Sequence, residues 1–131
     1  MTKEELSQIY WLRKEVIMWQ SRLESLRSQS PMKGQEITGM PSGGSRTTSK
    51  IEERTIKIVE IEERIKELRD RADREEARLL QYIEEIGDSF VRQIIQYRFL
   101  ELKTWKGVAD CMGGDNTSES VRKALYRFLK K

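Results

Sequence analysis

The sequence predicts an all-α protein: a long antiparallel, coiled-coil-like helical hairpin followed by a helix-turn-helix domain. Charged residues of both signs make up 36% of the 131 residues, as is typical of long solvated helices. Both prolines, Pro31 and Pro41, fall in one short stretch, so the rest of the chain has no proline to break a helix. Apolar residues recur at heptad spacing on both sides of that stretch, which favours two helices that pack against each other.

The first helix is expected over residues 3–29. Its apolar residues alternate between spacings of three and four, the pattern of a coiled-coil seam: Ile9, Leu12, Val16, Trp19, Leu23 and Leu26. Three further apolar residues, Tyr10, Ile17 and Met18, are expected to broaden this stripe.

A flexible loop is expected at residues 30–49, which hold four glycines, two prolines and many hydroxyl residues. Such a loop is long for a hairpin connection. It contains two apolar side chains, Ile37 and Met40. These side chains fit two interpretations: they fold back on the helices, or they contact a partner.

The second helix is expected to begin at the capping-box spacing of Ser49 and Glu52. A heptad frame then runs through Ile51, Ile58, Ile61, Ile65, Leu68, Ala72, Leu79, Tyr82 and Ile86. This helix would be roughly 55 Å long and the first roughly 40 Å, at about 1.5 Å per residue. If the two are aligned at the loop, the first helix ends opposite Glu75.

The hairpin is therefore assigned to residues 1–75 and the helix-turn-helix domain to residues 76–131. Beyond Glu75 the second long helix still carries a wide apolar face, made of Leu79, Leu80, Tyr82, Ile83 and Ile86. We expect this face to pack against the C-terminal region, so that both domains share the end of the second long helix.

The C-terminal domain is expected to contain three further helices. Gly87 and Asp88 stop one helix and cap the next, over residues 89–102, with these core candidates: Phe90, Ile94, Ile95, Tyr97, Phe99 and Leu100. Thr104 is expected to cap the following helix.

A helix-turn-helix is predicted from Ala109 and Gly113, the small crossing residue and the turn glycine that such a motif needs four residues apart. Trp105, Val108 and Met112 supply the buried side of its first helix. The apolar anchor Val121 lies two residues later than in standard motifs, so the turn is expected to carry extra residues within 114–116. The last helix should then begin at Thr117 or Ser118.

The last helix has a buried and an outward side. Helical spacing places Val121, Leu125, Phe128 and Leu129 on the buried stripe. The N-terminal outward residues of a recognition helix reach base edges, and here these are Ser118, Glu119, Arg122 and Lys123. Glu119 can accept from a cytosine amino group, and Arg122 can bridge a guanine. The expected phosphate contacts are Lys103, Lys106, Thr117, Arg127, Lys130 and Lys131.

Composition argues against catalysis and against bound cofactors. The chain has no histidine and a single cysteine, Cys111, so the usual general base and a zinc site are both missing. We therefore expect no enzyme, cofactor, metal or small-molecule ligand. A polar N-terminus, no long apolar run and no disulfide fit a cytoplasmic protein without a membrane partner.

The charge is placed unevenly along the chain. From Asp88 onward there are nine basic residues against five acidic ones, whereas the first 87 residues hold sixteen against seventeen. The excess positive charge thus falls in the predicted helix-turn-helix domain, and nucleic acid is the obvious acidic partner.

The C-terminal part of the chain resembles region 4 of bacterial sigma factors, through the residues DSFVRQIIQYRFLELKTWKGVADCMG…SVRKALYRFLKK. The whole chain resembles the ArpU/RinA-like regulators encoded by phages of Gram-positive bacteria, through EELSQIYWLRKEV, ITGMPSGG and RFLELKTW…VRKALYRFLKK. This resemblance implies a sigma-region-4-like DNA-binding domain and a role in transcription of phage genes, late ones in particular. The reader positions that it implies are Ser118, Glu119, Arg122 and Lys123.

The function expected is therefore sequence-specific transcription regulation. Its partners would be double-stranded DNA, host RNA polymerase as a candidate contact of the hairpin, and a second copy of the chain, since pairing strengthens weak single modules. Two alternatives stay open: a DNA-packaging protein of the small-terminase kind, and an adaptor that binds polymerase or another protein but never DNA.

Overall fold

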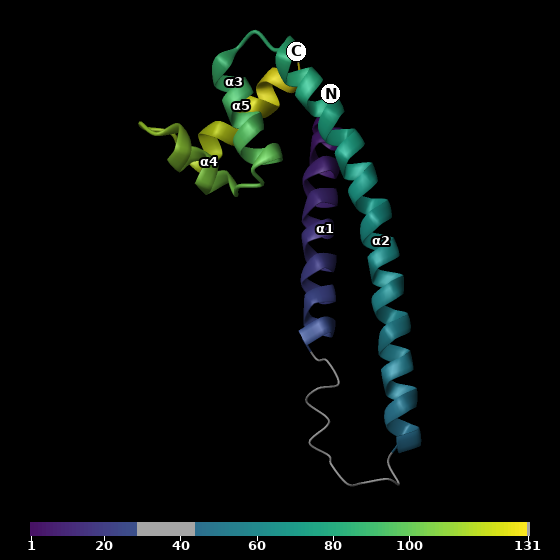
Figure 1. Cartoon of the computed structure of the whole chain (residues 1–131). Coiled ribbons are helices and arrows are strands. Elements are labelled where there is room, and N and C mark those ends of the chain that lie inside the picture. Colours follow the sequence, from purple (N-terminus) through teal and green to yellow (C-terminus); the bar gives the residue numbers. More distant parts are fainter. Residues whose placement is uncertain (29–43, 131) are drawn as a thin grey trace. The chain divides into compact units, whose positions relative to one another are not determined.

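The structure is a computed structural model that describes residues 1–28 and 44–130, with the side chains of 44–49 left out. This part of the chain is all-helical, as predicted. Its elements are α1 (Lys3–Ser28), α2 (Gly44–Glu85), α3 (Ser89–Ile95), the π-helix η3 (Gln96–Leu100), α4 (Trp105–Met112) and α5 (Ser118–Leu129) (Figure 1). The predicted loop residues Ile37 and Met40, and Lys131, lie outside the described residues.

The chain divides into two compact units that are not the predicted pair. One unit combines residues 1–14 with residues 70–131, and the other holds residues 15–69. The sequence placed residues 1–14 in the hairpin alone, whereas their contacts group them with the C-terminal helices. Whether 76–131 also folds as a domain by itself stays a prediction.

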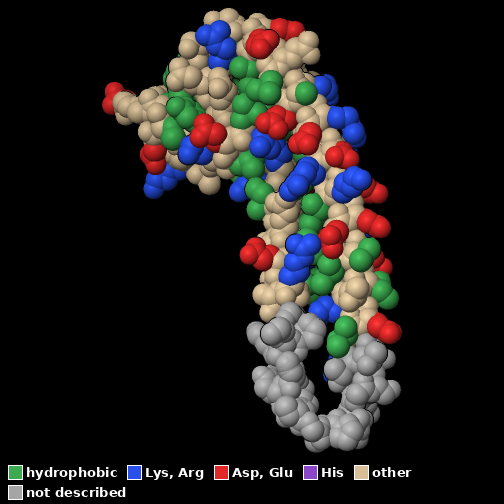
Figure 2. All heavy atoms as spheres, in the orientation of Figure 1, with side chains coloured by type: hydrophobic (Ala, Val, Ile, Leu, Met, Phe, Trp, Pro, Cys, Tyr) green, Lys and Arg blue, Asp and Glu red, His purple; other side chains and the backbone are tan. Residues whose placement is uncertain are grey.

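The unit of residues 15–69 is a pair of helices from α1 and α2. Val16, Leu23 and Ile65 are buried, and the guanidinium of Arg27 pairs with Glu62 at 3.5 Å. In Figure 2 hydrophobic side chains are visible between these helices, and acidic and basic side chains cover much of their surface. Val16, Leu23 and Ile65 all belong to the predicted seam.

The apolar stripe of α1 is narrower than predicted. Ile17 and Met18 are exposed, so the expectation that they broaden the stripe was wrong. They lie one and two residues beyond Val16, at about 100° per residue, which turns them away from the seam. Ile51, predicted in the seam of α2, is also exposed.

Helix α2 begins earlier than predicted. Its first residue is Gly44, so residues 44–49 are helical rather than part of the loop, and the Ser49–Glu52 spacing does not mark the start. Ser, Thr and Arg cost at most about 0.7 kcal/mol each in a helix, and extending an existing helix is far easier than nucleating one. A long stable helix can therefore include them.

The core of the other unit is built from both ends of the chain. Leu6, Ile9 and Tyr10 of α1 join the end of α2 and the four C-terminal elements in one buried cluster, whose remaining members are Leu79, Ile83, Ile86, Val91, Ile94, Ile95, Phe99, Val108, Ala109, Val121 and Leu125. The predicted packing of the end of α2 against the C-terminal region is thus confirmed for Leu79, Ile83 and Ile86. Leu80 is exposed, and its predicted burial was wrong.

Helix α1 extends further along α2 than the sequence predicted. Glu5 Oε2 lies 3.3 Å from Arg78 Nη2, and Met1 and Tyr82 pack partly buried against the core. The expected end of α1 opposite Glu75 was therefore wrong. Aligning the helices at the loop caused the error, because Arg27, the residue before the last one of α1, pairs with Glu62, well inside α2.

The helix predicted at residues 89–102 is split into α3 and η3. Asp88 caps it by accepting from the Phe90 and Val91 amides, as predicted, but Phe90 is exposed rather than in the core. The widened turn of η3 ends with Glu101 N donating to Gln96 O at 3.0 Å. Arg13 Nη1 donates to Phe99 O at 2.9 Å, which satisfies a carbonyl at the end of this helix.

Candidate nucleic-acid interface

Helices α4 and α5 form the predicted helix-turn-helix. Thr104 caps α4 by accepting from the Gly107 amide at 3.1 Å. Ala109, the predicted crossing residue, is buried with Val108 on α4, and both belong to one core cluster with Val121 and Leu125 of α5. Small and β-branched residues at this crossing let the two helices approach closely.

The turn between these helices accommodates its extra residues through two glycines. Gly113 and Gly114 have φ angles of 74° and 64°, in the left-handed region that favours glycine. The side chain of Asn116 then donates to Gly113 O at 2.8 Å and closes the turn. The longer turn therefore preserves the packing of α4 against α5.

Helix α5 begins where the sequence predicted. Thr117 is its N-cap: its hydroxyl accepts from the Ser120 amide at 3.1 Å, and the Ser120 hydroxyl accepts from the Thr117 amide at 2.8 Å. This reciprocal capping box fixes Ser118 as the first helical residue.

The four predicted base-reading residues share the solvent side of α5. Ser118, Glu119, Arg122 and Lys123 are all exposed. Glu119 Oε1 lies 2.9 Å from Lys123 Nζ, one turn along the helix. The hydrogen bond from Lys123, followed by its charge, lowers the pKa of Glu119, so this carboxylate stays ionised at neutral pH. Without DNA, α5 thus presents the Glu119–Lys123 pair beside the exposed Arg122, whose charge also lowers the pKa of Glu119.

The predicted phosphate contacts fall in two places. Arg127 and Lys130 are exposed along α5, and Lys106 is exposed near the start of α4. Lys103 is half-buried, with its ammonium 3.9 Å from Glu101 Oε1, so part of its charge is offset locally. Thr117 is exposed, and capping uses its oxygen as an acceptor while its hydroxyl proton can still be donated.

Sequence reasoning missed a ladder of stacked side chains beneath this surface. Arg98 of η3 lies between the rings of Tyr10 and Trp105, with its guanidinium carbon 3.9 and 4.5 Å from their centroids. Trp105 meets Tyr126 of α5 edge to face at 6.1 Å, and Lys3 Nζ lies 4.3 Å over the Tyr126 ring. These contacts join residues from both ends of the chain, and no local pattern signals them.

Burial disfavours the charged form of the central arginine of that ladder. Desolvation lowers the pKa of Arg98, against the opposing effect of Tyr10 and Tyr126. Arg98 Nη1 donates to Lys103 O at 2.9 Å, which links η3 to the residue just before the Thr104 cap. The ladder thus holds α4 at its start.

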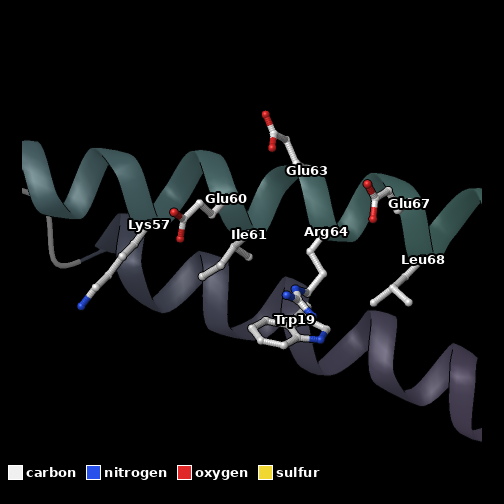
Figure 3. Close-up of a pocket in the computed structure, with 8 residues that line it drawn as sticks. All are labelled: Trp19, Lys57, Glu60, Ile61, Glu63, Arg64, Glu67 and Leu68. Atoms are coloured by element: carbon white, nitrogen blue, oxygen red, sulfur yellow. The ribbon is translucent and has the colours of Figure 1, made fainter.

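A surface groove of about 550 Å³ lies between α1 and α2 within residues 15–69 (Figure 3). Arg64 reaches from α2 to the Trp19 ring, 5.2 Å from its centroid, and Glu63 points away. Trp19 Nε1 donates to Glu15 Oε2 at 3.2 Å. The residues that line the groove carry charges of both signs: Lys57, Glu60, Glu63, Arg64 and Glu67. The groove therefore has no clear preference for an anionic or a cationic ligand.

Two features are absent from the residues that the structure describes. Within residues 1–28 and 44–130 no group of three His, Cys, Asp or Glu side chains could hold a metal ion. None of the described helices is both long enough and apolar enough to cross a membrane.

Comparison with known proteins identifies no relative: no family model, curated protein or solved structure matches this chain.

Proposed function

We propose that this protein is a sequence-specific DNA-binding transcription regulator that acts through α4 and α5. The single observation that carries the proposal is the two-sidedness of α5. Val121 and Leu125 fix one side in the core, while the four reader positions stand exposed on the other. A helix held in this way can enter a major groove with its N-terminal side chains toward base edges.

Charge supports the same conclusion. Arg122 and Lys123 lie in the first half of α5 and Arg127 and Lys130 in the second, all exposed, with Glu119 as the acidic residue of that helix. Arginine and lysine in the later turns contact phosphates and set the position of the helix on the duplex.

The resemblance to sigma region 4 and to the ArpU/RinA-like regulators makes phage gene transcription the proposed setting. Because a single helix-turn-helix binds weakly, we expect two copies to act together on DNA. Contact with host RNA polymerase belongs to the same proposal.

A salt-dependent titration of double-stranded DNA of mixed sequence tests the proposal. Wild-type affinity should fall steeply with salt, with a log–log slope of about −0.9 for each phosphate contacted. Arg122→Ala/Lys123→Ala should weaken binding, whereas Lys66→Ala/Arg71→Ala removes the same two charges from α2 and should not. Absent or salt-insensitive binding by the folded wild type would rule the proposal out.

A further inference from the structure

We propose that Lys3, from the first turn of α1, contacts a DNA phosphate beside the second half of α5. The inference rests on the proposed function and extends it: the DNA-binding surface then includes a residue from the opposite end of the chain. It starts from the contact of the Lys3 ammonium with the Tyr126 ring, at 4.3 Å from the centroid.

Tyr126 lies half-buried at the edge of the outward side of α5, where its ring packs against the core. Arg122 lies four residues before it and Lys130 four residues after it, so the three side chains form one row along the helix. The edge-to-face contact with Trp105, at 6.1 Å and 78°, fixes the Tyr126 ring. A cation above that ring therefore lies between two exposed basic residues of the recognition helix.

The first turn of α1 is held firmly enough to position Lys3. Thr2 caps it, since the Glu5 amide donates to the Thr2 hydroxyl at 3.1 Å. Glu5 pairs with Arg78, and Leu6 is buried in the core. Lys3 itself is exposed, so ordering it on DNA needs little rearrangement.

The Lys3 charge is available to a ligand. A cation over a ring face keeps its charge and directs part of its N–H groups to solvent. Glu5 is paired with Arg78 and Glu119 with Lys123, while Glu4, next to Lys3 in the chain, is exposed. Lys3, Arg122 and Lys130 therefore make this side of the surface positive.

The ligand chemistry is a phosphate of the DNA backbone rather than a base. Lysine is a compact point charge, and base edges are reached from the N-terminal part of a recognition helix. Lys3 instead lies against the later part of α5, where side chains contact the backbone. The contact would thus add affinity without adding sequence preference.

The test compares Lys3→Gln and Lys14→Gln in salt titrations of a short mixed-sequence duplex. Lys14 is the matched control, because its ammonium also lies over a tyrosine, Tyr10, at 5.6 Å, but that ring belongs to α1. Lys3→Gln should reduce the magnitude of the salt slope by about 0.9 and weaken binding about fivefold near 0.15 M salt. Lys14→Gln and Lys3→Arg should bind as wild type does.

Two results would overturn the inference while leaving the proposed function standing. One is an unchanged slope for Lys3→Gln when Arg122→Ala/Lys123→Ala binds weakly. The other is tighter binding by Lys3→Gln, which would mean that the first turn of α1 obstructs DNA. Failure of the wild type itself to bind would overturn both proposals together. Thermal unfolding of each variant shows that its fold is intact.

Discussion

The guanidinium carbon of Arg98 lies 3.9 Å from the ring centroid of Tyr10, and this contact joins the π-helix η3 to α1. The same carbon lies 4.5 Å from the ring centroid of Trp105. The arginine thus connects the first helix of the chain with the first helix of the helix-turn-helix. Its planar group suits stacking between two rings better than a lysine ammonium does.

Arg98→Ala should destabilise the protein by about 2–4 kcal/mol, since it removes two cation–π contacts and a hydrogen bond to Lys103. Arg98→Lys should retain only part of this stability, because it keeps the charge but loses the planar group. Chemical denaturation measures both. Arg71→Ala, at an exposed site on α2, should change stability by less than about 0.5 kcal/mol. Equal small effects at both sites would contradict the role given to Arg98.

The contribution of α1 to the C-terminal core is tested by one substitution at two sites of that helix. Ile9 is 1% exposed and Ile17 is 52% exposed. Ile9→Ala should cost about 2–5 kcal/mol of unfolding free energy, and Ile17→Ala less than about 1 kcal/mol. Amide exchange should show that Ile9→Ala loosens α5 as well as α1. Protection of α5 that survives Ile9→Ala unchanged would mean that the C-terminal helices are stable without α1.

The long turn of the helix-turn-helix depends on glycine at Gly113. No atom within 4 Å would meet an added Cβ there, yet its φ of +74° is unfavourable for other residues. Since its ψ of −171° also places it where essentially only glycine is found, Gly113→Ala should cost about 1–3 kcal/mol through backbone strain alone. Gly87→Ala is the control, because that site is equally open and has no left-handed φ. Equal melting temperatures for the two variants would exclude backbone strain in this turn.

The Glu119–Lys123 pair predicts a pH effect with a defined sign. The hydrogen bond from Lys123 lowers the pKa of Glu119 from its ordinary value of 4.5. Because the pKa is lowered in the folded protein, the ionised carboxylate stabilises the fold at any pH above the ordinary pKa. This stabilisation is lost as the pH falls through the lowered pKa. The melting temperature of Glu119→Gln should therefore be slightly below that of wild type at pH 7, and the difference should shrink below about pH 4.5.

The double variant Glu119→Gln/Lys123→Gln separates this pair from other effects. If the two side chains act through each other, the double variant should be no less stable than either single variant. Strictly additive losses would show that each side chain acts independently.

Local patterns predicted the secondary structure and the motif well. Asp88 and Thr104 cap helices as predicted, and Thr117 caps α5, whose start at residue 117 or 118 was predicted. Gly113 has the positive φ that its place after an apolar helix required. Such features depend on a few neighbouring residues, so the sequence carries them directly.

Long-range packing was not predictable in the same way. The heptad pattern allows α1 and α2 several alignments, and long-range contacts such as the Glu5–Arg78 and Arg27–Glu62 pairs distinguish among them. Lys3 and Tyr126 meet from opposite ends of the chain. Their contact depends on how α1 is aligned with α2. Because the sequence prediction placed the end of α1 opposite Glu75, it did not bring Lys3 near Tyr126. The exposed reader residues, by contrast, depend only on the spacing within α5.

The most direct test of the central claim is to map where DNA contacts the protein. Backbone amide NMR shifts, followed as a short duplex of mixed sequence is added, report contacts along the whole chain. The largest changes should fall on α5, at Ser118, Glu119, Arg122 and Lys123, with further changes at Lys106 and Lys130, while residues 50–69 of α2 stay unchanged. Shifts confined to α2, or none at all with the fold intact, would contradict the assignment of α5 as the DNA-reading helix.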